Sequence, residues 1–95
     1  MSTFINSPKT VDQLREEYDN ASEKARRYKN ANFIFDFPED ADIYYLKLIR
    51  EKYLKYMDFK KAELSEKQYN KFIRPVYSKK LRDVELFLRE RGVSV

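Results

Sequence analysis

Hydrophobic positions along residues 10–30 recur every three or four residues, which predicts an amphipathic helix. They are Val11, Leu14, Tyr18, Ala21, Ala25 and Tyr28. So narrow a stripe is typical of a helix that packs against one neighbour, and the small side chains of Ala21 and Ala25 allow that neighbour to come close. A capping box at Thr10, or alternatively Ser7 as N-cap, begins the helix.

A second helix is predicted over residues 39–62, with an acidic entrance and a much wider apolar face. At ~100° per residue its apolar side chains cover an arc of roughly 220°, whereas about 100° is enough to face one core. The remaining, solvated side carries Lys47, Glu51, Lys55 and Asp58. The wide arc predicts that this helix has more than one neighbour.

Two further helical segments complete the chain. A short helix is predicted over residues 65–74, where Pro75 ends or sharply kinks it. The last helix is predicted over residues 76–91 and stops at Gly92, the only glycine, which is placed for a left-handed C-cap. Its inward stripe consists of Tyr77, Leu81, Val84, Phe87 and Leu88.

These segments predict an all-α fold, a compact helical bundle of three long helices and one short helix. A length of 95 residues fits a single domain spanning residues 1–95. The chain is 42% hydrophobic and 38% charged, so it has enough apolar surface to fold.

The connector between the first two long helices, residues 31–38, is the most hydrophobic loop of the chain. Phe33, Phe35 and Phe37 alternate along it, so an extended backbone would point all three rings the same way. One interpretation is a hydrophobic plug beneath the bundle. The other is an exposed ridge of phenylalanines that docks into another protein.

The net charge of +4 comes entirely from the last third of the sequence, since residues 65–95 hold 8 basic and 4 acidic side chains. Lys79, Arg82, Leu86 and Arg89 recur there at helical spacing opposite the apolar stripe, and we call these four the basic ridge. Arg74 and Lys80 lie close in sequence. The ridge is either a solvated face or a contact for an anionic partner such as nucleic-acid phosphate or an acidic protein surface.

The composition disfavours an enzyme. With no Cys, no His and one Gly, the chain lacks the means for zinc sites, thiol nucleophiles, histidine bases and glycine-rich phosphate loops. The acidic residues Asp36, Glu39, Asp40 and Asp42 match no calcium loop, and we interpret them as helix-capping groups rather than metal ligands. We therefore expect no catalytic residue, metal or cofactor.

The N-terminal residues show no secretion signal, and no apolar stretch approaches the ~18 residues of a membrane span, so an intracellular, cytoplasmic location without membrane contact is expected.

Together these features predict a small, non-catalytic helical protein that binds another macromolecule. It would act by occlusion or bridging, as an accessory subunit of a larger assembly or as an inhibitor or regulator. In size and composition it resembles small regulators of phages and mobile elements, although no motif ties it to a named family. The predicted protein-binding residues are Phe33, Phe35, Phe37, Tyr45, Tyr56, Phe59 and Leu86.

Two alternatives stay open. One is nucleic-acid binding through the basic C-terminal helix, with Arg74, Lys79, Lys80, Arg82 and Arg89 on the anionic partner. The other is a helical homo-oligomer in which the arc of Tyr45, Tyr56 and Phe59 forms a symmetric interface.

Overall fold

The computed structural model describes residues 9–95, a range that contains helices, turns and no strand. The long helices are α1 (Val11–Ala31), α2 (Ile43–Glu63) and α4 (Arg74–Glu90). A short α3 (Glu66–Gln68) and a π-helical turn, η1 (Tyr69–Ile73), lead into α4. The all-α prediction is confirmed. No helix within the described range has the length and apolar character needed to cross a membrane.

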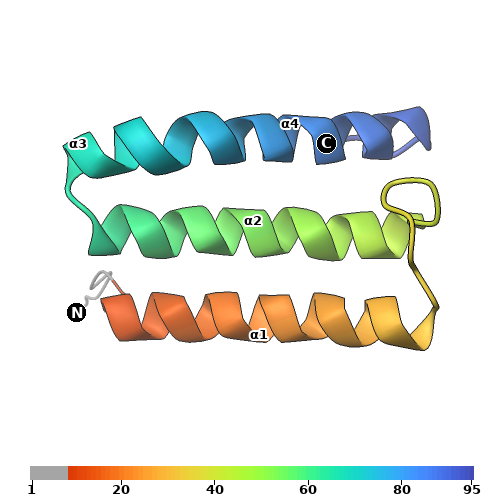
Figure 1. Cartoon of the computed structure of the whole chain (residues 1–95), viewed down its shortest axis with the longest axis horizontal. Coiled ribbons are helices and arrows are strands. Elements are labelled where there is room, and N and C mark those ends of the chain that lie inside the picture. The colour runs from red at the N-terminus through yellow and green to blue at the C-terminus, as the bar shows by residue number, and fades with distance from the viewer. Residues whose placement is uncertain (1–8) are drawn as a thin grey trace, which may run out of the picture.

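The three long helices lie side by side in one flattened layer, each antiparallel to the next, with α2 in the middle (Figure 1). α2 packs against α1 on one side and against α4 on the other. The molecule measures 45 × 31 × 24 Å, as expected for such a layer. A helix with two neighbours needs apolar side chains on both flanks, which explains the wide apolar arc of α2.

The seam between α1 and α2 forms as the spacing of its apolar residues predicts. Ala21 and Ala25 are buried in it. At the start of α1, the Thr10 hydroxyl accepts the Gln13 backbone N–H at 3.1 Å, and the Gln13 side chain accepts the Thr10 N–H at 2.9 Å. Thr10 is therefore the N-cap, while the alternative at Ser7 lies outside the described residues.

The core sits along α2 and is closed by α4 and the connector. Leu46, Val84 and Leu88 are its most completely buried large side chains. The buried cluster also takes in Ala25, Ile34, Ala41, Tyr45, Leu48 and Ile49. Residues from both neighbours of α2 thus share one core.

The second helix begins later than the predicted boundary at residue 39. Residues 38–40 form a turn, and Asp42 is the N-cap of α2, accepting the Tyr45 backbone N–H at 2.8 Å. This side-chain cap fixes the start of α2 at Ile43, four residues after the predicted boundary.

Of the two alternatives predicted for Pro75, the end of a helix is wrong, because the chain is helical from Glu66 to Glu90. Pro75 has no N–H to donate to a carbonyl one turn earlier. The preceding residues form the π turn η1, in which the Arg74 N–H donates to the Tyr69 carbonyl, five residues back. This wider turn shifts the hydrogen-bond pattern just before the proline, and Pro75 then falls in the first turn of α4, where its missing N–H is tolerated.

The C-terminal end of α4 agrees with the sequence prediction. Gly92 has a φ of +84°. Its N–H donates to the Arg89 carbonyl at 2.9 Å, and the Val93 N–H donates to the Leu88 carbonyl at 3.0 Å. This is a Schellman motif, which needs a left-handed residue at the position of Gly92.

Candidate interaction surface at the connector

α1 ends in a chain reversal that places a phenylalanine where a glycine is expected. Phe33 has a φ of 53°, a left-handed conformation that favours glycine. The following residue, Ile34, donates its N–H to the Lys29 carbonyl at 3.0 Å and is only 3% exposed. Burial of Ile34 in the core therefore fixes the reversal and holds Phe33 in this backbone conformation.

Two aspartates hold the connector from within. The Asp40 carboxylate accepts the backbone N–H of Phe35 at 3.2 Å and of Asp36 at 3.0 Å. Asp42, besides capping α2, accepts the Tyr28 hydroxyl at 2.5 Å, and this hydrogen bond is the main reason that the pKa of Tyr28 is raised. Asp42 is therefore a helix-capping group, as interpreted from the sequence, whereas Asp40 binds backbone N–H groups of the connector.

Arg91 joins the connector to α4 by hydrogen bonds. Its guanidinium donates to the Phe87 carbonyl at 3.0 Å and to the Pro38 carbonyl at 3.3 Å. Phe37 packs on the same place, with its ring edge-on to Phe87 at 5.9 Å and to Tyr45 at 6.3 Å. The connector is thus attached to the end of α4, and Figure 1 shows it beside the C-terminal end of that helix.

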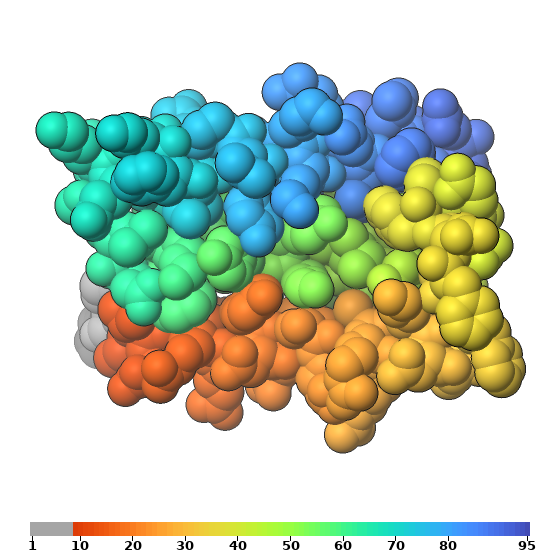
Figure 2. Space-filling view, viewed as in Figure 1, coloured from red at the N-terminus to blue at the C-terminus, as the bar shows by residue number. Residues whose placement is uncertain are grey.

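The three connector phenylalanines do not share one environment. Phe37 is 44% exposed and contacts the core, whereas Phe33 is 71% exposed and Phe35 is 77% exposed. The rings of Phe33 and Phe35 lie 6.4 Å apart. We call these two residues the phenylalanine pair. The connector is therefore buried in part and exposed in part: Ile34 and Phe37 anchor the loop, and the phenylalanine pair faces solvent. Figure 2 shows the segment around residue 35 at one end of the molecule.

The aromatic residues predicted on α2 lie against neighbouring helices. Tyr45 and Phe59 are each 7% exposed. Tyr56 is half-buried, with its ring 5.0 Å from Tyr18 of α1 and 4.6 Å from Tyr77 of α4. These contacts join the three helices of one chain, so we leave Tyr45, Tyr56 and Phe59 out of the candidate surface.

The basic ridge is exposed along the outer side of α4, and several of its cations already have partners within the chain. Lys79 pairs with Asp83 at 3.5 Å, and Arg89 donates to the Val95 carbonyl at 3.1 Å. Arg82 and Leu86 face solvent.

The other two predicted cations lie apart from the ridge. The Lys80 ammonium lies 5.8 Å from the Tyr53 ring centre and 5.6 Å from that of Tyr77, on the side of α4 that faces α2. Arg74 lines a groove of about 540 Å³ beside Tyr69 and Met57. The five cations predicted to bind an anionic partner therefore do not form a single cationic surface.

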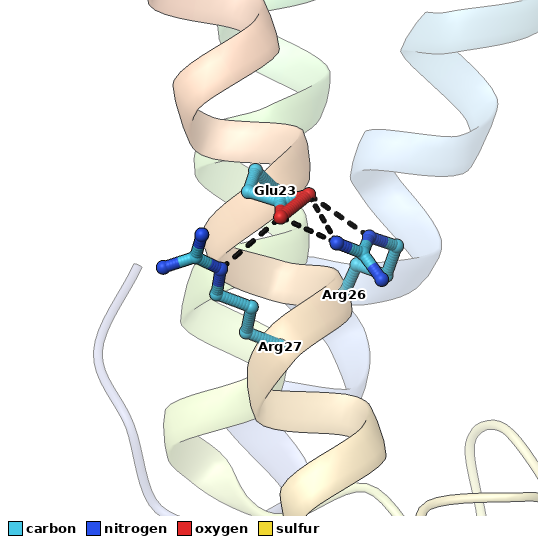
Figure 3. A network of polar contacts seen from close by, with 3 residues as sticks. All are labelled: Glu23, Arg26 and Arg27. Carbon is cyan, nitrogen blue, oxygen red and sulfur yellow. Dashed lines mark hydrogen bonds and ion pairs between the residues drawn. The ribbon is translucent and has the colours of Figure 1, made fainter.

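Near the end of α1, the carboxylate of Glu23 binds two arginines, Arg26 and Arg27 (Figure 3). Glu23 accepts from the Arg26 Nε at 2.9 Å and from the Arg27 Nε at 3.1 Å. The hydrogen bonds from both arginines hold the pKa of Glu23 below its usual value, and the bond from Arg26 has the larger effect. The basic end of α1 is thus partly neutralised by a carboxylate of the same helix.

Comparisons with protein-family models, with curated proteins and with solved structures find no match. The candidate surface therefore rests on its own geometry. The strained backbone of Phe33 was missed by the sequence analysis, and the only signal for it was indirect: a helix ends at Ala31 with no glycine to follow it.

Proposed function

We propose that this protein is a non-catalytic binding protein that docks onto a protein partner through the phenylalanine pair, as an accessory subunit or as an inhibitor. The observation that carries the proposal is the state of Phe33, which is 71% exposed while its backbone has a φ of 53°. A left-handed conformation costs a non-glycine residue on the order of 1 kcal/mol. Burial of Ile34 holds this backbone conformation, but the Phe33 ring itself adds little to the stability of the isolated chain, because most of its surface stays exposed.

Phe35 strengthens the argument. Its ring is 77% exposed, yet its backbone is fixed by the hydrogen bond to Asp40. A rigid backbone that presents aromatic rings loses little conformational entropy when the rings enter a pocket, and buried aromatic residues often dominate the binding energy of an interface. The pair supplies two such rings side by side.

Nucleic-acid binding through the basic ridge has less support. Lys79 and Arg89 are engaged within the chain, and Asp83 and Glu90 lie among the cations. A phosphate-binding surface gains affinity from several free cations that act together.

A photo-crosslinking amino acid at position 35 tests the proposal in the source cell. We expect a covalent adduct with one protein at position 35 and none at Lys24, an exposed position on α1. An adduct with nucleic acid, or equal labelling at both positions, would contradict the proposal.

The captured partner then allows a direct affinity measurement. The double variant Phe33→Ala, Phe35→Ala should weaken binding about 100-fold or more, as expected when two hot-spot residues are removed. Phe72→Ala is the matched control, because Phe72 is a 59% exposed phenylalanine outside the connector. If the double variant and the control bind the partner equally well, the phenylalanine pair is not the docking surface.

A further inference from the structure

The outer side of α4 carries a strip of side chains that remain largely exposed to solvent. Val76, Lys79, Asp83 and Leu86 are spaced so that they fall on one side of the helix. Val76 is 48% and Leu86 49% exposed, and the side chains of Lys79 and Asp83 are 75% and 50% exposed. α4 packs on α2 from its other side and forms one edge of the layer (Figure 1). We call these four residues the outer strip.

The outer strip is complementary to itself. Its order is apolar, cation, anion, apolar, so an identical strip running in the opposite direction sets Val76 opposite Leu86 and Lys79 opposite Asp83. Each such contact then occurs twice, as in every two-fold interface. A parallel alignment in register would instead set Lys79 against Lys79 and Asp83 against Asp83, which is repulsive.

We infer that the outer strip pairs two copies of this chain, with the two α4 helices antiparallel and Val76 of one copy packed on Leu86 of the other. Lys79 and Asp83, which pair within one helix at 3.5 Å, exchange partners across the interface. The inference goes beyond the proposed function and stands without it. The connector lies beside the C-terminal end of α4, so the dimer would carry its two phenylalanine pairs at opposite ends, an arrangement suited to bridging two partner molecules.

One residue opposes this pairing. Arg82 lies beside the outer strip, near the middle of the aligned helices, and would face its own copy there. The interface is also a single helix pair with only two exposed apolar residues per strip, so we expect a weak, concentration-dependent dimer. Arg82→Ser should tighten it by removing two like charges.

Molar mass by light scattering, as a function of concentration, gives the first test. The wild-type chain has a mass of 11.6 kDa, and we expect its apparent mass to approach twice that value. A constant monomer mass up to ~1 mM would overturn the inference, since it limits association to less than about 4 kcal/mol.

Charge reversals test the proposed contacts. Lys79→Glu alone and Asp83→Lys alone each create like-charge contacts across the interface, and each should weaken the dimer about 10-fold or more. An equimolar mixture of the two variants restores opposite charges at every contact and should recover the doubled mass. Because both side chains are exposed, helicity should survive, which circular dichroism checks. Failure of the mixture to associate would contradict the Lys79–Asp83 contact.

Disulfide trapping tests the direction of the helices. The chain has no cysteine, so the double variant Val76→Cys, Leu86→Cys introduces the only thiols. Under mild oxidation it should form a covalent dimer, whereas Val76→Cys alone should not. A covalent dimer formed readily by the single variant would show that like residues meet, and it would rule out the antiparallel alignment.

Discussion

α2 and the connector are both rich in aromatic residues, and each has one of intermediate exposure, Tyr44 at 48% and Phe37 at 44%, but their extremes differ. On α2, Tyr45 and Phe59 are each 7% exposed; in the connector, Phe33 and Phe35 are 71% and 77% exposed. The difference lies in their positions in the layer. α2 has a helix on each side, whereas the connector lies at the end of the layer. Aromatic content alone therefore does not distinguish a buried core from an exposed surface.

The two regions also differ in backbone. α2 is a regular helix capped by Asp42, and its conformation suits the residues that it carries. The connector holds Phe33 at a φ of 53°, where the residue type and the conformation disagree. Local disagreement of this kind in an otherwise consistent fold points to a functional site.

The largest expected effect tests whether burial separates the two regions. Phe59→Ala should lower the free energy of unfolding by about 3–5 kcal/mol, because the ring is buried and its loss leaves a cavity. Phe35→Ala makes the same chemical change and should alter it by less than about 0.5 kcal/mol, because the ring is exposed. Urea denaturation of both variants measures the difference. Equal losses of stability would mean that Phe35 belongs to the core.

The two regions should also respond differently to alkaline pH. The aromatic residues of α2 include tyrosines, which ionise, whereas those of the connector are all phenylalanines, which do not. Burial raises the pKa of Tyr53 above its ordinary value. Above pH ~10 the folded chain therefore retains a proton that the unfolded chain has lost, so stability is full below that pH and falls as the pH rises through the folded-state pKa.

Thermal unfolding between about pH 9 and 11 measures this decline. Tyr53→Phe removes one of the ionisable groups and should lose less stability over that range than the wild type. Identical declines in the two proteins would exclude Tyr53 as a source of the pH dependence.

The smallest effect concerns the strain in the connector. Phe33→Gly should raise the free energy of unfolding by roughly 0.5–1 kcal/mol, because glycine adopts the left-handed conformation without a side-chain clash and little packing is lost. Gly92→Ala at the other left-handed position, where φ is +84°, should lower it by a similar amount. A clear loss of stability in Phe33→Gly would show that the exposed ring stabilises the fold after all.

Much of the fold could be predicted from local sequence. The Thr10 capping box, the alanines of the α1 seam and Gly92 each act within one or two helical turns, so the sequence alone indicates what they do. The wide apolar arc of α2 even predicted two neighbours. The π turn before Pro75 could not be predicted, because a proline in this context either breaks a helix or falls in its first turn, and the choice depends on how the preceding residues pair.

The candidate surface was predicted only in part. Phe33, Phe35 and Phe37 were recognised as a group, but their alternation along the chain did not indicate that Phe37 packs against Phe87, 50 residues away in the sequence. The wide apolar arc of α2 predicted Tyr45 and Phe59 as protein-binding residues, but both are buried. Which apolar residues remain exposed depends on contacts between distant segments.

The sequence alone is enough to predict the helices, most of their caps and the faces that must be buried, because these features depend on side chains a few residues apart. The tertiary structure decided the arrangement of those helices in one layer and the separation of the phenylalanine pair from the core. It also left the outer strip of α4 exposed to solvent. Such outcomes depend on which surfaces remain after long-range packing, and no local pattern contains that information.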